Sequence, residues 1–183
     1  RRRSLVATWR KHRVRPMDLD LVVEAVAKAL PDHPQLNATL VGDALKINEN
    51  VNIGIAMAQD HGIIVPVLHS AEKLNLLEIA SGLRDLAKKA KDGSLAPSEV
   101  AGAGFTITSL ANYEIDAFTP IIDPPQVAIL GVGRVLEKPA VHNGEIAIRS
   151  IMHLSLTFNH RATDGVPASQ FLQAVTRGLE KSS

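Results

Sequence analysis

The sequence predicts one α/β domain of two layers, in which helices cover a mixed β-sheet. Apolar residues recur at a helical period in three stretches, and the shorter apolar or alternating runs between them are typical of strands. No repeat, low-complexity segment or internal linker divides the 183 residues. A chain of this length can bury one sizeable core, and helices packed on a sheet are a stable way to do so.

Three helices follow from the periodicity. The first is expected from Pro16, which suits a first helical turn, to Pro31, which ends it. The second covers residues 76–90 and has lysines near its C-terminus, where positive charges interact favourably with the helix dipole. The third follows Gly165. Their apolar stripes are Leu19, Val22, Val23, Val26, Ala27 and Leu30; Leu76, Ile79, Leu83, Leu86, Ala87 and Ala90; and Phe171, Leu172, Val175 and Leu179.

Short strands are expected before and after the second helix. Residues 38–57 are rich in Val, Ile and Ala and predict two or three strands. Residues 63–68 predict one short strand, in which Pro66 indicates an edge or a bulge. Residues 105–108 alternate between apolar and polar side chains, as a strand with two different faces does.

The later strands surround a long irregular segment. Residues 126–133 are almost continuously apolar, so we expect both faces of that strand to be covered. Asn143-Gly144 predicts a tight hairpin into a strand that starts at Ile146. Residues 111–125 form the longest expected loop, and loops of that length are often functional.

Composition limits the classes of function. The chain has no cysteine, which excludes thiolate nucleophiles, disulfides and cysteine-based zinc sites. Its seven histidines form no metal-binding motif, so no metal is expected. No apolar run approaches the roughly 20 residues of a membrane span. The net charge of +1 and an aromatic content of 3% argue against a nucleic-acid partner.

Residues 1–15 form a basic N-terminal segment with seven Lys or Arg side chains, and residues 16–183 form the domain. The charge run fits a basic arm for an anion or an acidic partner, and it also fits a solvated helix face or a linker end. A nucleic-acid-binding arm would give strongly salt-dependent affinity for DNA.

His160 is the most informative candidate for chemistry. It follows an alternating strand pattern and precedes Asp164 and Gly165, where a helix pattern opens. An imidazole at a strand end with a nearby carboxylate can act as a general base, although a strand-end histidine taken alone is more often structural than catalytic. Thr108 and Ser109 end another strand, where a hydroxyl can donate to an oxyanion or stabilise a turn. The glycines around Val132 lack a dinucleotide-binding pattern and fit close backbone approach within a sheet.

The chain resembles the C-terminal catalytic domain of the dihydrolipoamide acyltransferases, the core components of 2-oxo acid dehydrogenase complexes. The resemblance runs from about Pro16 to the C-terminus and rests on several blocks that match in order. These are residues 25–30 and 33–38, 52–57 and 62–67, 104–110 and 118–122, 124–133, and the His-x-x-x-Asp-Gly signature in residues 159–165. Such a domain has the chloramphenicol acetyltransferase-like fold.

This resemblance implies acyl transfer between the thiols of a dihydrolipoyl group and coenzyme A, with both as substrates. His160 would be the general base, Thr108 would donate to the oxyanion, and Asp164 would support the structure of the site. Ser109 and Gly133 would line the coenzyme A pocket.

The resemblance also implies assembly. Relatives form trimers that build a larger cage, so His160 of one chain would meet Thr108 of its neighbour. The E1 and E3 enzymes would bind through domains absent here. We expect a cytoplasmic location, or the mitochondrial matrix in a eukaryote.

The chain departs from the family pattern in three places. Asn159 stands where the family usually has Asp, and residues 111–114 replace common glycines, which leaves the loop shape and the acyl specificity open. The N-terminal part of the usual domain is expected to be missing before Arg1, together with the lipoyl and peripheral-subunit-binding domains, so the chain reads as a fragment. Two rival interpretations are a chloramphenicol acetyltransferase, which shares the fold and the signature, and an inactive assembly scaffold.

Overall fold

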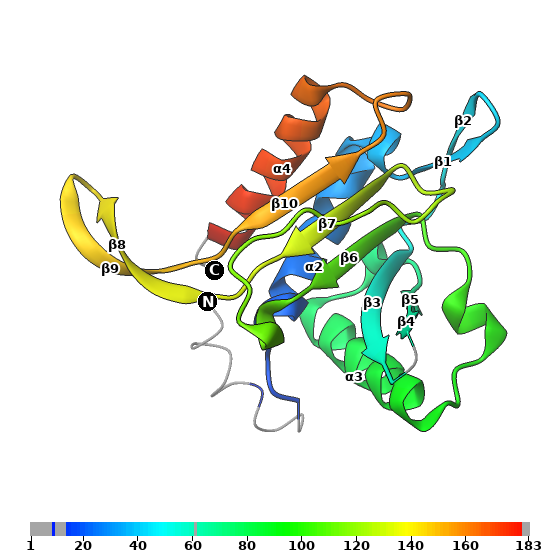
Figure 1. Cartoon of the computed structure of the whole chain (residues 1–183), viewed down its shortest axis with the longest axis horizontal. Coiled ribbons are helices and arrows are strands. Elements are labelled where there is room, and N and C mark those ends of the chain that lie inside the picture. Colours follow the sequence, from blue (N-terminus) through cyan, green and yellow to red (C-terminus); the bar gives the residue numbers. More distant parts are fainter. Residues whose placement is uncertain (1–8, 10–13, 61, 181–183) are drawn as a thin grey trace.

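A computed structural model describes residues 9, 14–60 and 62–180 of the chain. Figure 1 shows a central sheet with helices packed on it and a long hairpin that projects from the body. Most of the predicted basic segment, residues 1–15, lies outside the described residues. Among those described, no helix is both long and apolar enough to cross a membrane.

The central sheet is mixed, as predicted. Its strand order is β10-β7-β6-β3-β4, with β5 also paired to β3. β6 runs parallel to both β3 and β7, whereas β10, β4 and β5 are antiparallel to their neighbours. The strands are β3 (Ile53–Gln59), β4 (Gly62–Ile64), β5 (Val67–Leu68), β6 (Phe105–Ser109), β7 (Ala128–Val132) and β10 (Leu154–Phe158).

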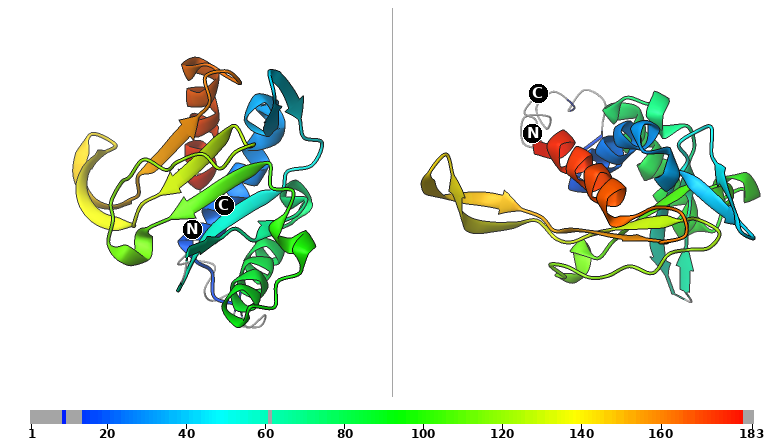
Figure 2. Two further views of the ribbon diagram at one scale, coloured as in Figure 1. Left: turned by 45° about the vertical axis from the view of Figure 1, so that its right-hand side comes forward. Right: turned by 90° about the horizontal axis from the view of Figure 1, so that it is seen from above.

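Three helices lie on one face of this sheet, and the view from above in Figure 2 shows α2 and α4 together on that side. They are α2 (Asp18–Ala29), α3 (Leu76–Asp92) and α4 (Gly165–Glu180). Between α2 and the sheet, Val22 and Val26 are fully buried, and the rings of Phe105 and Phe171 meet edge to face at 5.6 Å. Each such side chain contributes about 1.5–3 kcal/mol by leaving water, which makes this layer the core.

The first helix starts two residues later than Pro16 suggests. The carboxylate of Asp20 accepts the backbone N–H of Met17 at 2.7 Å, and this contact caps a helix that begins at Asp18. The same carboxylate accepts from Arg84 of α3 at 2.6 Å, so the charge of Asp20 is paired although its side chain is fully buried. The N-terminus of α2 is thereby tied to α3.

Residues 63–68 form two strands instead of the single strand predicted. β4 and β5 are separated by Val65 and Pro66, and both pair with β3. Pro66 has no N–H to donate, but its carbonyl accepts from Ile55 at 2.8 Å. The proline therefore interrupts the strand while its backbone remains attached to β3.

Two hairpins extend beyond the central sheet. β1 (Ala38–Val41) pairs with β2 (Ala44–Ile47), and β8 (Leu136–His142) pairs with β9 (Glu145–Ile151). The second turns at Asn143-Gly144 with positive φ at both residues, as predicted. It projects as an arm on which Val141, Ile146 and Ile148 are exposed.

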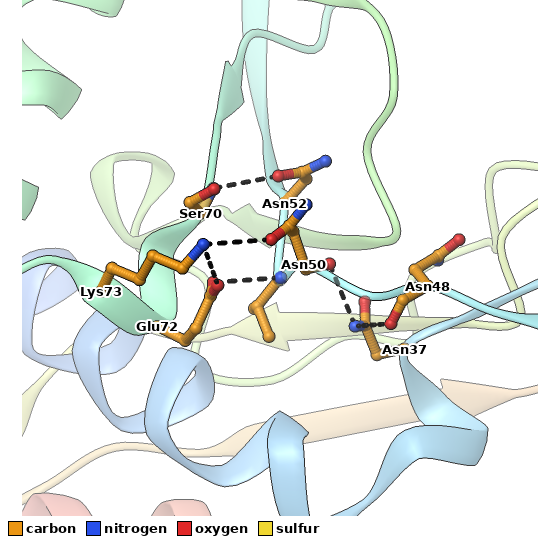
Figure 3. Close-up of polar contacts among 8 residues, drawn as sticks. Asn37, Asn48, Asn50, Asn52, Ser70, Glu72 and Lys73 are labelled. Carbon is orange, nitrogen blue, oxygen red and sulfur yellow. Dashed lines mark hydrogen bonds and ion pairs between the residues drawn. The ribbon is translucent and has the colours of Figure 1, made fainter.

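Asparagine side chains connect the first hairpin to the start of β3. Asn37 donates to the carbonyl oxygens of Asn48 and Asn50, both at 3.2 Å (Figure 3). Asn52 accepts from the N–H of Ser70 and donates to the carbonyl of Gly102, both at 3.0 Å. These bonds fix the position of residues 37–52 against the sheet.

The remaining short elements are single turns. The 3-10 turns are Leu30–Asp32, Pro34–Leu36, Ala71–Lys73, Pro97–Val100 and Ala111–Tyr113. The turn at Ala111 is the only regular element inside the described loop 111–125.

Candidate active site

His160 lies in the connection between β10 and α4. The N–H of Asn159 still bonds to Val127, the residue just before β7, at 2.8 Å, so the residue before the histidine is held at the edge of the sheet. The His160 ring lies against the Phe158 ring, with centroids 5.0 Å apart. Its Nδ1 is 3.5 Å from Oδ1 of Asp164, which is longer than a hydrogen bond, and both side chains are exposed. The imidazole is therefore open to an incoming group.

Thr108 lies near the C-terminal end of β6. Its neighbour Ile107 is buried in the helix-side core, so Thr108 points to the opposite face by strand alternation. The side chain is half-buried, and its hydroxyl makes no hydrogen bond within the part of the chain that the structure describes. It is thus a free donor.

The two candidates lie far apart within one chain. Thr108 is level with Gly131 of β7, which is level with Ser155 of β10. From Ser155 the chain runs four residues, about 13 Å, to Asn159, and two strand spacings add about 10 Å sideways. The sheet also separates them, because Phe158 beneath the His160 ring packs against the helix-side core. One chain does not place both side chains at one reacting carbonyl.

Ser109 and Gly133 have clear local roles. The Ser109 hydroxyl oxygen accepts the N–H of Ala111 at 3.3 Å, which stabilises the turn that follows the strand. A methyl group on Gly133 would overlap the carbonyl oxygen of Asp116, so only glycine allows the loop to approach here. The predicted close backbone approach is present at Gly133, but the approaching backbone is the loop at Asp116 and not a neighbouring strand of the sheet. This loop covers the strand end next to Thr108.

An ion-pair cluster holds that loop in place. Asp116 accepts from Arg134 at 2.6 Å and from Lys138 at 3.3 Å, and the N–H of Arg134 donates to Ile115 at 2.9 Å. The hydrogen bond from Arg134, and then that from Lys138, lowers the pKa of the Asp116 carboxyl below its usual range. Glu114, within the segment that departs from the family pattern, adopts the left-handed conformation with φ of 61°, which glycine adopts more readily.

A cavity lies elsewhere on the molecule. It measures about 1220 Å³ and lies between the β8–β9 arm and α4, where His142, Arg149 and Leu172 are among its lining residues. Neither Thr108 nor His160 lines it. The described residues also contain no cluster of three or more His, Asp or Glu side chains that could hold a metal ion.

The residues that hold the His160 connection were not among the predicted site residues. Arg161 donates to the carbonyl of Gly42 at 2.9 Å and to Asp43 at 2.6 Å. Thr163 is buried and donates to Gln35 at 3.2 Å. These contacts span more than 110 positions, so no local sequence pattern could have indicated them.

The chain matches known proteins over almost its whole length. Residues 2–183 match the family model "2-oxoacid dehydrogenases acyltransferase (catalytic domain)". The dihydrolipoyllysine-residue acetyltransferase component of the Bacillus subtilis acetoin cleaving system is 41% identical over 87% of this chain and 40% of its own length. The corresponding pyruvate dehydrogenase component of Rickettsia felis is 39% identical over 88% and 39%. A succinyltransferase component of the 2-oxoglutarate dehydrogenase complex of Haemophilus influenzae is 36% identical over 93% and 42%. The chain therefore spans about two fifths of these relatives.

Solved structures agree with the fold. A probable dihydrolipoamide acetyltransferase of Listeria monocytogenes superposes with a TM-score of 0.93 at 32% identity, covering 100% of this chain and 80% of that one. The cubic core of a pyruvate dehydrogenase multienzyme complex gives 0.91 at 35%, covering 97% and 74%. The dihydrolipoamide acetyltransferase of Azotobacter vinelandii, studied for the catalytic roles of a serine, a histidine and an asparagine, gives 0.91 at 34%, covering 97% and 74%.

A chloramphenicol acetyltransferase superposes with a TM-score of 0.61 at 12% identity, covering 88% of this chain and 77% of that one. At that identity the likeness concerns the fold alone. The predicted α/β class, a mixed sheet with covering helices in a chloramphenicol acetyltransferase-like arrangement, is confirmed.

Proposed function

Because the chain belongs to the catalytic-domain family of the 2-oxoacid dehydrogenase acyltransferases, we propose that it transfers an acyl group between the thiols of a dihydrolipoyl group and coenzyme A. Its relatives carry acyltransferase names of this kind, with acetyl and succinyl groups both represented. As part of a longer protein, the chain would form the self-associating core to which the E1 and E3 enzymes are joined.

One observation carries the assignment of residues. In the Azotobacter protein the histidine lies 52 positions after the serine and four before the asparagine. Thr108, His160 and Asp164 have the same spacing in this chain. Thr108 keeps the hydroxyl of the serine, and His160 keeps the imidazole. Asp164 has a carboxylate of the same shape as the amide of the asparagine.

The reaction needs only these residue types. Nε2 of His160 removes the proton from the thiol of coenzyme A, whose ordinary pKa of about 8.5 makes a modest base sufficient at neutral pH. The thiolate sulfur forms a bond to the carbonyl carbon of the acyl-dihydrolipoyl thioester, and the negative charge moves to oxygen. The Thr108 hydroxyl donates to that oxyanion, a contact worth roughly 3 kcal/mol.

The intermediate then collapses. The bond between carbonyl carbon and dihydrolipoyl sulfur breaks, and the imidazolium of His160 returns its proton to the leaving thiolate. No covalent bond to the enzyme forms, which suits a chain without cysteine. Since Thr108 and His160 lie on opposite faces and at opposite ends of one sheet, we place each site between two copies of the chain, as in a trimer within a larger cage.

The test is an assay on the full-length protein with dihydrolipoamide and a series of acyl-coenzyme A donors: acetyl, succinyl and branched-chain. Chloramphenicol as the acceptor is the comparison, because a chloramphenicol acetyltransferase would prefer it. We expect transfer to dihydrolipoamide and none to chloramphenicol, with the best donor naming the acyl group. Absence of transfer to dihydrolipoamide from every donor would contradict the proposal.

His160→Ala tests the base directly. We expect turnover to fall by at least about 100-fold while the protein still assembles, because the variant removes the proton acceptor and the His160 side chain is largely exposed. Sedimentation of the variant supplies the control for assembly. Unchanged turnover in an intact assembly would show that His160 is not the base. If His160→Ala does not assemble, the conservative variant His160→Gln replaces it, and the same fall in turnover is expected.

A further inference from the structure

The histidine itself has little to hold it. Its ring is exposed, it contacts the Phe158 ring, and its distance to Asp164 exceeds a hydrogen bond. A general base has to lie within about 0.5 Å of its productive position, so other groups have to fix the backbone that carries it.

His160 lies in a turn that Asn159 closes. The Asn159 side-chain oxygen accepts the N–H of Arg161 at 2.9 Å, and the Asn159 carbonyl accepts the N–H of Ala162 at 2.9 Å. These bonds close the turn locally. The N–H of Asn159 also ties the start of the turn to Val127 at 2.8 Å, and Thr163 ties the residues after it to Gln35 at 3.2 Å.

The Arg161 side chain anchors the residue that directly follows His160. Its Nη2 donates to the Gly42 carbonyl at 2.9 Å and to the Asp43 carboxylate at 2.6 Å, in the turn between β1 and β2. That hairpin is itself attached to the sheet, because the N–H of Leu40 donates to Pro125 at 2.9 Å and Thr39 bridges to Gln126. A chain of bonds thus runs from the sheet through the hairpin to the residue after His160.

We propose that Arg161 is the positioning residue of His160, and that the β1–β2 turn is the part of the domain on which it is anchored. The inference rests on the proposed acyl transfer. Arg161 acts on the base through the backbone, so its loss lowers the fraction of enzyme whose imidazole is aligned. Turnover then falls while substrate binding is preserved.

The test compares Arg161→Met with Arg161→Lys and Asp43→Asn in the full-length protein. We expect Arg161→Met to lower kcat by about 10- to 100-fold with KM for coenzyme A and dihydrolipoamide within about twofold of wild type. Arg161→Lys restores part of kcat, because a lysine can still donate to the Gly42 carbonyl and the Asp43 carboxylate, whereas a purely hydrophobic replacement cannot. The double variant Arg161→Met with Asp43→Asn is no slower than Arg161→Met alone, since both remove one interaction.

Lys28→Met is the matched control. It removes an exposed cation from an ion pair of the same 2.6 Å length on α2 and is expected to leave kcat unchanged. Normal kcat in Arg161→Met overturns the positioning role, and so does a raised KM for coenzyme A with preserved kcat, which would make Arg161 a substrate-binding cation. An inactive wild-type protein would instead contradict the proposed acyl transfer. That result is distinct from the two outcomes above, because both of them require an active wild-type protein.

Discussion

Gly133 illustrates how a single residue shapes the site by having no side chain. Its Cα faces the carbonyl of Asp116, and the loop that carries Asp116 covers the strand end beside Thr108. The nearby Gly131 has a milder constraint, since a methyl group there would lie 3.1 Å from Pro120. The two glycines therefore let the loop lie directly on β7.

Gly133→Ala is expected to destabilise the protein by about 2–3 kcal/mol, because the methyl group forces the loop away from the sheet. Thermal unfolding of the variant measures the loss. Gly165→Ala is the control, as a methyl group there meets nothing within 4 Å. A Gly133→Ala protein with wild-type stability and lost affinity for coenzyme A would instead assign this glycine to the substrate pocket.

At this scale the sequence indicates the candidate site residues better than the residues that hold them in place. His160 and Asp164 stand in a short motif, and Thr108 ends a strand with a recognisable alternation, so all three can be named in advance. Arg161 lies in the same motif, but its role depends on Asp43, which is 118 positions away. Only the fold brings those two residues together.

Among the elements, the loop 111–125 depends on charge for its attachment. Asp116 contacts Arg134 just beyond β7 and Lys138 in β8, so one carboxylate joins the loop to the base of the projecting arm. Both partners favour the ionised form, which is why the pKa of Asp116 lies below its usual range.

This attachment should weaken in acid. A carboxylate whose pKa is lower in the folded than in the unfolded state contributes stability above its unfolded pKa of about 3.9, and that contribution is lost as the pH falls through the lowered folded value. We expect Asp116→Asn to have a lower Tm than wild type at pH 7, and the difference to shrink towards zero below about pH 3.5.

Thermal melts of both proteins across this range check the expectation. Asp60→Asn, at an exposed aspartate in the turn after β3, is the control and should show no such convergence. A Tm difference for Asp116→Asn that persists unchanged into acid would show that the loop is held by the shape of the side chain and not by its charge.

The spacing of apolar residues predicts the helices and strands well, because it follows from which face of each element is buried. The stripes in α2 and α3 contain the fully buried Val22, Val26 and Ile79, and β7 is buried at every position, as its continuous apolar run implies. The exception is residues 63–68, where apolar character continues through Pro66 but backbone hydrogen bonding does not. Composition cannot distinguish one strand from two at such a point, since both pack against β3.

For the whole molecule, the position of the sheet between Thr108 and His160 has a direct consequence. If each site takes the hydroxyl from one copy and the imidazole from the next, a chain without its own imidazole still supplies a working Thr108, and a chain without its own hydroxyl still supplies a working His160. Two inactive variants should then restore each other when they assemble together.

Co-expression of His160→Ala with Thr108→Val under two affinity tags tests this, with assemblies that carry both tags selected by sequential purification. Each variant alone should be nearly inactive. With random mixing at equal amounts, about a quarter of the contacts between neighbouring copies combine an intact Thr108 with an intact His160, as expected for a heterologous ring. Activity should rise to about that fraction of wild type. The control pairs His160→Ala with the double variant His160→Ala and Thr108→Val, in which no contact holds both groups, and it should stay inactive. A mixture no more active than its components would place both groups of each site in one chain, which is the arrangement that the opposite faces and ends of the sheet argue against.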